Sequence, residues 1–226
     1  MNYCFGLISE GPSDQCVLRS ILSGYFNTSD PSTTPLQPSI DATSGKYDDG
    51  NWDKVIKYIK TENFVDAFDN VQFVILQIDT DWVDSKEHSY EIQFEINDTS
   101  EARVQKMKSF LIHEMGNDLH AQFQDRIIWS IADRQTECWL LPLYASTKTV
   151  NCLHTLNQYL QPKFDFTINK KEKSYYEKAS KEFRNRKLYD KSDSFQESMN
   201  TFLIQFEKVL PGRLICEDQQ DDTFIP

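Results

Sequence analysis

Three apolar runs, each ending in an acidic residue, constrain this chain more than any other feature of its sequence. Residues 3–9 lead into Glu10, residues 71–78 into Asp79, and residues 126–132 into Asp133. Continuous apolar runs of this length are typical of strands covered on both faces, and helical apolar patterns separate them. Strands that alternate with helices predict an α/β fold with a mostly parallel, Rossmann-like sheet and crossover helices.

The acidic residues at the ends of these runs are expected to lie close together. The carboxyl ends of parallel strands meet at one edge of a sheet, where ligands bind. Residues i and i+2 of an extended segment point the same way, so Asp79 and Asp81 can face one ion together, and Glu10 approaches from a neighbouring strand. Carboxylate oxygens suit Mg²⁺ or Mn²⁺, so the pattern predicts a metal site that activates water against a phosphodiester.

Two segments, in this order, resemble the Toprim domain of topoisomerases, primases, recombination proteins and OLD-type nucleases. They are ISEGPSD at residues 8–14 and ILQIDTD at residues 75–81. A third segment, RQTECWLLPLY at residues 134–144, is similar to small stand-alone Toprim proteins that are encoded beside an ATPase in bacterial anti-phage systems. The resemblance covers roughly residues 2–145, and the separation of 69 residues between Glu10 and Asp79 is long for the minimal Toprim fold.

The resemblance implies a nuclease that depends on Mg²⁺ or Mn²⁺. Glu10 is then a catalytic general base or a metal ligand, Asp79 and Asp81 are catalytic metal ligands, and Glu137 and Asp133 are candidates for a second metal. The substrate is DNA or RNA, including transfer RNA, and the partner is an ATPase in an anti-phage defence system. The alternative is a regulatory subunit of an ATPase complex that has a Toprim-like shape and no activity.

Each of these acidic residues also has an ordinary structural explanation. Glu10 can be a turn residue beside a helix N-terminus, and Asp79 and Asp81 can be loop acids that cap the next segment. Asp133 stands at a strand-to-helix turn, and Glu137 falls in a first helical turn, where the helix dipole favours acids. The Asp-x-Asp pair also occurs in nucleotidyl and glycosyl transferases, although this chain has no glycine-rich phosphate loop.

Basic residues supply the candidate contacts to nucleic acid. Lys46 and Arg134 are candidates for the basic residue that OLD-type nucleases place near the cleaved phosphate. Residues 169–186 form the most basic region and include Tyr and Phe side chains suited to base stacking, although a solvated helix face explains the same pattern. The candidates in that region are Lys170, Lys171, Lys173, Arg184 and Arg186.

Length and composition indicate a folded chain of one main domain. The 226 residues are 39% hydrophobic, which is enough for a sizeable core. We expect a catalytic domain over residues 1–148 and a helical extension over residues 149–226 packed on it. The net charge of −11 argues against a surface that coats nucleic acid broadly, although bound metal would neutralise part of this charge.

Cysteine usage and hydropathy bear on the cellular compartment. Five cysteines, an odd number without a CxxC pair, predict reduced thiols in a cytoplasmic protein. No apolar run approaches 18 residues, so we expect no membrane span. The oligomeric state is left open by the sequence.

Overall fold

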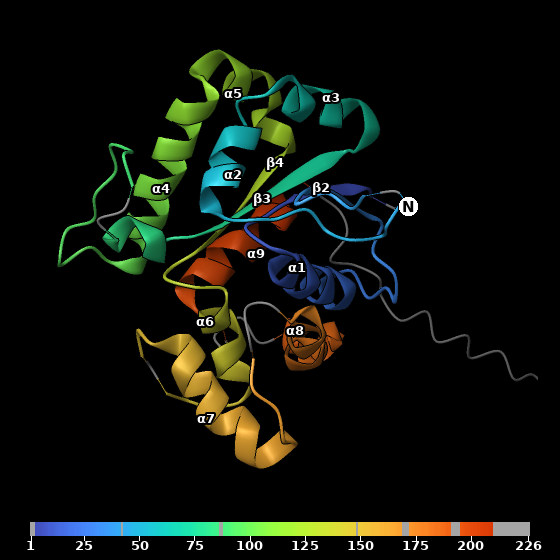
Figure 1. Ribbon diagram of the computed structural model, residues 1–226, viewed down its shortest axis with the longest axis vertical. Coiled ribbons are helices and arrows are strands. Elements are labelled where there is room, and N and C mark those ends of the chain that lie inside the picture. The colour runs from blue at the N-terminus through green and yellow to red at the C-terminus, as the bar shows by residue number, and fades with distance from the viewer. Residues whose placement is uncertain are drawn as a thin grey trace, which may run out of the picture.

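A four-stranded parallel sheet lies at the centre of the computed structural model, which describes residues 3–41, 43–85, 88–147, 149–168, 172–190 and 195–209 (Figure 1). The spatial order is β2-β1-β3-β4, and every neighbouring pair is parallel. The expected α/β fold with a parallel sheet is therefore confirmed. The strands are β1 Phe5–Ile8, β2 Thr33–Gln37, β3 Phe73–Asp79 and β4 Ile127–Ala132.

Helices cover both faces of this sheet. Successive strand residues alternate between the faces, so that Ile75 and Ile128 pack on the side of α1 and α9, whereas Leu76 and Trp129 pack on the side of α2, α3 and α4. No described helix has both the length and the apolar character needed to cross a membrane. The described α-helices are α1 Pro12–Tyr25, α2 Trp52–Tyr58, α3 Glu62–Asn70, α4 Ser100–Met115, α5 Asn117–Phe123, α6 Glu137–Leu140, α7 Cys152–Phe164, α8 Lys173–Ala179 and α9 Glu197–Val209.

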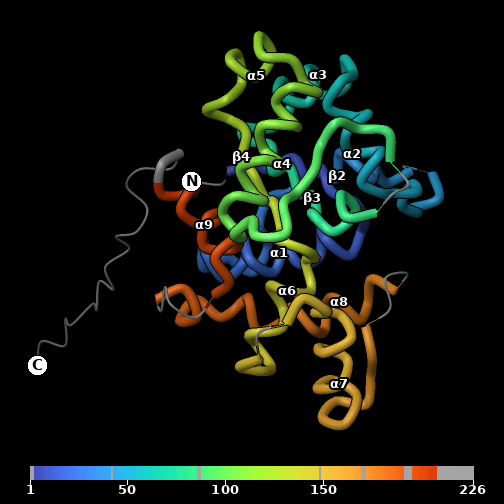
Figure 2. Tube along the Cα trace, turned by 90° about the vertical axis from the view of Figure 1, so that its left-hand side faces the viewer, coloured from blue at the N-terminus to red at the C-terminus, as the bar shows by residue number. Residues whose placement is uncertain are grey.

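The segments after residue 149 pack against the rest of the chain. One apolar cluster joins Leu22 of α1 and Leu140 of α6 to Leu156 of α7 and Phe202 of α9. Figure 2 shows α7 and α8 together at one end of the molecule, with α6 between them and the sheet. Residues on both sides of position 148 thus share a core, and the domain boundary at that position stays a prediction.

Helix α9 covers β4, which is an edge strand of the sheet. The side chain of Gln205 accepts a hydrogen bond from the backbone N–H of Trp129 and donates one to its C=O, both at 2.8 Å. One amide side chain thereby satisfies both backbone groups of an edge residue, as a neighbouring strand would. Covering an edge in this way blocks its pairing with another chain.

The sequence pattern predicts three elements that differ from the structure: a helix over residues 51–68, a short strand near residues 39–42 and a helix over residues 170–188. The helix expected over residues 51–68 is broken into α2 and α3, because the Thr61 hydroxyl donates to the C=O of Tyr58 (2.8 Å) and competes with the helical ladder. The strand expected near residues 39–42 lies earlier, as β2. The long helix expected over residues 170–188 is the shorter α8, followed by 3-10 turns at Lys181–Arg184 and Arg186–Leu188.

The expectation that all cysteines are reduced thiols is wrong for one pair. Cys138 in α6 and Cys152 in α7 form a disulfide with a Cα–Cα distance of 5.0 Å. Packing of α7 beside α6 brings the two residues together across 14 positions, a spacing that carries no sequence motif. Cys4 and Cys16 are free, and Cys216 lies outside the described residues.

Candidate functional site

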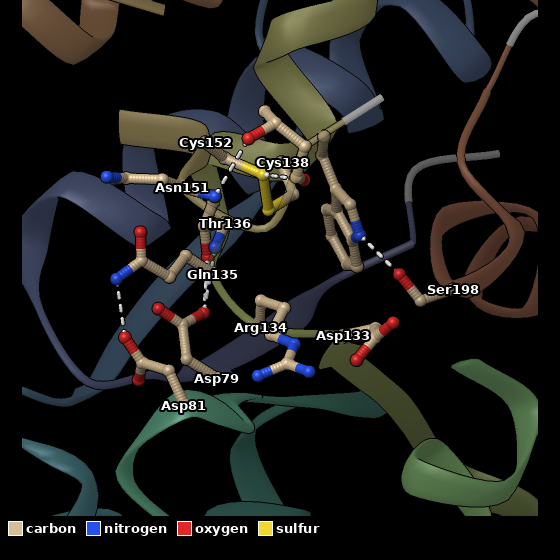
Figure 3. The surroundings of a disulfide bond; sticks show 12 residues. Asp79, Asp81, Asp133, Arg134, Gln135, Thr136, Cys138, Asn151, Cys152 and Ser198 are labelled. Atoms are coloured by element: carbon tan, nitrogen blue, oxygen red, sulfur yellow. Dashed lines mark hydrogen bonds between the residues drawn. A yellow bond between two sulfur atoms is a disulfide. The ribbon is translucent and has the colours of Figure 1, made fainter. Parts of the chain in front are cut away.

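Asp79, the last residue of β3, is buried and held in a fixed orientation. Its Oδ1 accepts hydrogen bonds from the Thr136 N–H (3.0 Å), the Thr136 hydroxyl (2.9 Å) and the Gln77 side-chain amide (3.0 Å). Gln77 precedes it by two positions and therefore shares its face of the strand. Figure 3 shows Thr136, from the loop after β4, next to this carboxylate.

Glu10, which follows β1, is joined to Asp79 through backbone and side-chain contacts. Its Oε1 accepts the backbone N–H of Asp79 at 2.7 Å, and its own N–H donates to Oε1 of Gln77 at 3.2 Å. The fully buried Gln77 side chain therefore contacts both acidic residues. Sequence reasoning missed Gln77, although a single amide near the end of an apolar strand was a visible signal, since buried polar groups need partners.

Asp81 is held by the same loop after β4. Its Oδ2 accepts from the side-chain amide of Gln135 at 2.5 Å, and its backbone N–H donates to the C=O of Arg134 at 3.1 Å. The N–H of Thr80 also donates to that C=O (3.1 Å), while the N–H of Arg134 donates to the Thr80 hydroxyl (2.8 Å). The ends of β3 and β4 are thus tied together, with Arg134 in a left-handed conformation at φ 74°.

Glu137, in the first turn of α6, connects this site to the C-terminal part of the chain. Its side chain is buried, and its Oε1 accepts a hydrogen bond from the hydroxyl of Tyr176 in α8 at 2.5 Å. Burial, followed by the charge of Glu137, raises the pKa of Tyr176, so the hydroxyl keeps its proton and stays a donor. A residue beyond position 149 therefore orients one of the predicted metal ligands.

Five carboxylates form what we call the acidic centre: Glu10, Asp14, Asp79, Asp81 and Glu137. Burial raises the pKa of Asp79 well above its usual 3.8, and the charges of the other four raise it further. Asp14, in the first turn of α1, was not predicted as a site residue, because a first-turn acid is explained by the helix dipole alone. Its position four residues after Glu10 was the available signal.

A loop between β2 and α2 passes close to Glu10. A side-chain carbon at Gly50 would lie 2.1 Å from the Glu10 carbonyl oxygen, so only glycine fits there. In the same loop Lys46 is exposed, and the ring of Tyr47 lies 5.2 Å from the ammonium of Lys173 in α8. Lys173 is one helical turn before Tyr176, and its ammonium also pairs with Glu177 of the same helix at 3.5 Å.

Asp133 is placed outside the acidic centre. It forms an ion pair with the buried Arg103 (2.9 Å), which also contacts Asp84 (3.3 Å). A buried guanidinium needs carboxylate partners, which explains why Asp133 turns toward it. Arg134 pairs with Asp84 at 2.8 Å, and Figure 3 shows Asp133 on the far side of Arg134 from Asp79.

The remaining predicted nucleic-acid contacts lie along the segment after α8. Arg186 forms an exposed pair with Asp190 at 3.4 Å, and Arg184 is exposed in the preceding 3-10 turn. Lys170 and Lys171 lie outside the described residues. Among the described candidates, Arg134 is the one whose backbone contacts the acidic centre, since its C=O accepts the N–H of Asp81.

The acidic centre fits a hard divalent cation in charge and in ligand chemistry. Within the described part of the chain, no group of three or more Asp, Glu, His or Cys side chains is placed so that it could hold a metal ion. Mg²⁺ does not need such a group, because it keeps several waters and is bound through one or two carboxylates together with substrate phosphates. Asp79 at the end of β3 and Asp81 in the 3-10 turn Asp81–Asp84 are the two carboxylates that would hold such an ion.

The comparisons with known proteins add no family to this description. A function must therefore be argued from the geometry of the acidic centre and from the sequence resemblance. No protein-family model, curated protein or solved structure matches this chain.

Proposed function

We propose that this chain is a nuclease that uses Mg²⁺ or Mn²⁺ to cleave phosphodiester bonds in DNA or RNA. The observation that carries the proposal is the meeting of five carboxylates around Asp79, at the carboxyl edge of a parallel sheet. Three of the five, Asp14, Asp79 and Glu137, are buried. Buried carboxylates are costly unless protons or cations neutralise them, and oxygen ligands favour Mg²⁺ or Mn²⁺. The Toprim resemblance falls on three of the same residues, Glu10, Asp79 and Asp81.

The proposed chemistry is hydrolysis by an activated water. A divalent ion bound there would lower the pKa of a coordinated water and stabilise charge on the phosphate. Glu10 accepts the proton of the attacking water, whose oxygen forms the new bond to phosphorus as the bond to the leaving oxygen breaks. The leaving oxygen takes a proton from solvent, so that one strand end carries the phosphate and the other a hydroxyl.

Residues around the carboxylates position them for this reaction. Gln77 and Thr136 hold Oδ1 of Asp79, and the Asp79 N–H donates to Oε1 of Glu10, which orients that carboxylate. Tyr176 orients Glu137 in the same way. Lys173, in the same helix as Tyr176, is our candidate for the contact to the substrate phosphate.

A cleavage assay tests this proposal. Plasmid, single-stranded DNA and bulk transfer RNA are incubated with Mn²⁺, Mg²⁺ or chelator, using wild type, Glu10→Gln and Asp79→Asn. We expect metal-dependent cutting that falls by about 10²–10⁴-fold in Glu10→Gln, the usual contribution of a general base. The matched control is Asp118→Asn, an exposed acid in α5 near the opposite edge of the sheet. Equal cutting by wild type and both site variants would refute the proposal.

A second candidate function is a regulatory subunit of an ATPase complex without activity of its own. It is favoured by the lack of a preformed three-ligand cluster among the described residues. An ATPase partner is also what the resemblance to stand-alone Toprim proteins implies. If Mn²⁺ raises the melting temperature of the wild type but no substrate is cut, with or without a co-purified ATPase, this second function replaces the first.

A further inference from the structure

A cavity of about 510 Å³ lies outside the acidic centre, between the end of α7 and the segment that follows α6. Aromatic rings and lysine side chains line it together: Tyr144, Phe164, Phe166, Lys163, Lys178 and Lys181. Its volume falls in the range of roughly 300–1,000 Å³ that is usual for small-molecule sites. The acidic centre does not use any of these side chains.

The aromatic rings form one continuous wall. The rings of Tyr144 and Phe164 lie 5.8 Å apart, and those of Phe164 and Phe166 lie 6.3 Å apart. Phe166 in turn stacks on Tyr175 at 5.6 Å, with an angle of 8° between the planes. Phe164 remains 46% exposed with the Lys163 ammonium over its ring, so a flat ligand would stack on the exposed part of that ring.

Three lysines make this cavity positive on an otherwise acidic protein. Lys163 lies 5.2 Å from the ring of Phe164, and Lys178 lies 5.7 Å from the ring of Phe166. No salt bridge to a described residue neutralises Lys163, Lys178 or Lys181. Glu182 is the one acid that lines the cavity. The balance is therefore cationic, although the chain as a whole carries −11.

We propose that this cavity binds one unpaired nucleotide of a single-stranded nucleic acid, with the base on the aromatic wall and the phosphate on the lysines. Stacking on aromatic side chains accepts any base, because every base has a π face. A duplex keeps its base faces stacked inside the helix and cannot offer them. The inference rests on the proposed function, since it names the form of nucleic acid that the acidic centre receives.

Helix α8 links the cavity to the acidic centre. Tyr176 points toward Glu137, while Lys178, two residues later, lines the cavity. Residues i and i+2 of a helix lie on nearly opposite sides, so α8 stands between the cavity and Glu137. A strand whose base is held in the cavity therefore has to continue around α8 to reach the carboxylates.

Binding measured in chelator tests this inference separately from cleavage. Fluorescence anisotropy follows 12-residue oligo(dT), oligo(rU) and a matched DNA duplex, with wild type, Phe164→Ala, Lys178→Gln and the control Tyr159→Ala. Tyr159 is an exposed aromatic of α7 that does not line the cavity. We expect single strands to bind more tightly than the duplex, and Phe164→Ala to weaken binding about 5- to 150-fold, with no change in Tyr159→Ala.

Lys178→Gln keeps the test decisive if Phe164→Ala does not fold, because its side chain is exposed. This variant should lower the slope of log binding constant against log salt by about 0.7, the value for one phosphate contact on a single strand. Duplex binding equal to single-strand binding, unchanged affinity in the cavity variants, or equal competition by poly-glutamate would overturn the inference. Binding without any cleavage would support the inference about the cavity and contradict only the proposed nuclease activity.

Discussion

At the scale of single residues, the crowding of charge around Asp79 has a measurable consequence for stability. Burial and four neighbouring carboxylates raise its folded-state pKa above the unfolded value of 3.8. The folded protein therefore binds this proton more tightly than the unfolded chain does. The resulting gain in the free energy of unfolding is fully present below pH 3.8 and is lost as pH rises through the folded pKa. Above the folded pKa, without metal, the ionised Asp79 carboxylate opposes folding.

Asp79→Asn should therefore raise the melting temperature in chelator at pH 8, and the gain should shrink toward pH 4. Asparagine keeps the Oδ1 that accepts from Thr136 and Gln77, so the hydrogen bonds survive while the charge is removed. Thermal unfolding of both proteins from pH 4 to 8 measures this, with Asp118→Asn as the control. A variant that melts below wild type at pH 8 would contradict the charge argument.

The sequence indicated the carboxylates of the acidic centre better than it indicated the residues that hold them in place. Glu10, Asp79 and Asp81 were predictable because the carboxyl ends of parallel strands share one edge. Asp133 follows β4 in the same way, yet it forms an ion pair with Arg103 of α4. No local sequence pattern specifies this pairing. The role of Gln77 also depends on a tertiary contact. Its side-chain amide accepts the N–H of Glu10 only because β1 pairs with β3.

At the scale of elements, the disulfide between α6 and α7 fixes the helix that carries Glu137. Linking residues 14 positions apart is expected to stabilise the fold by about 3 kcal/mol, mainly through the unfolded chain. For a chain of this size that corresponds to about 6–12 °C in melting temperature. A dithiol reductant should therefore lower the melting temperature of the wild type by this amount.

Calorimetry of the wild type and of Cys138→Ala/Cys152→Ala, with and without reductant, provides the measurement. The double variant should melt near the reduced wild type and should not respond to reductant. Cys4→Ala, which removes a free thiol, should respond as the wild type does. If reductant leaves the wild-type transition unchanged, the disulfide does not contribute as we expect.

Element predictions succeeded where apolar runs were long and failed where they were absent. β1, β3 and β4 are buried strands with continuous apolar residues, and each was expected within a few positions. β2 is an edge strand, TTPLQ, in which Pro35 and three polar residues leave no apolar run to indicate a strand. Its position follows from pairing with β1, which is a tertiary contact.

At the scale of the whole molecule, Gln205 links the last described helix to the edge of the sheet. Gln205→Leu should keep the packing of α9 but leave the N–H and C=O of Trp129 without their side-chain partner. We expect a loss of about 1–3 kcal/mol in the free energy of unfolding, together with faster aggregation. Urea unfolding and light scattering measure the two effects. Gln158→Leu, at an exposed position of α7, should show neither; equal behaviour of the two variants would refute this role.

The same contact has a consequence for synthesis of the protein on the ribosome. Gln205 follows Trp129 by 76 residues, so the edge of β4 is made well before the side chain that covers it. At about 5–20 residues per second, that interval is roughly 4–15 s. During this time the nascent sheet presents an uncovered strand to other chains on the same messenger RNA, which makes this interval the point at which a chaperone would be most useful.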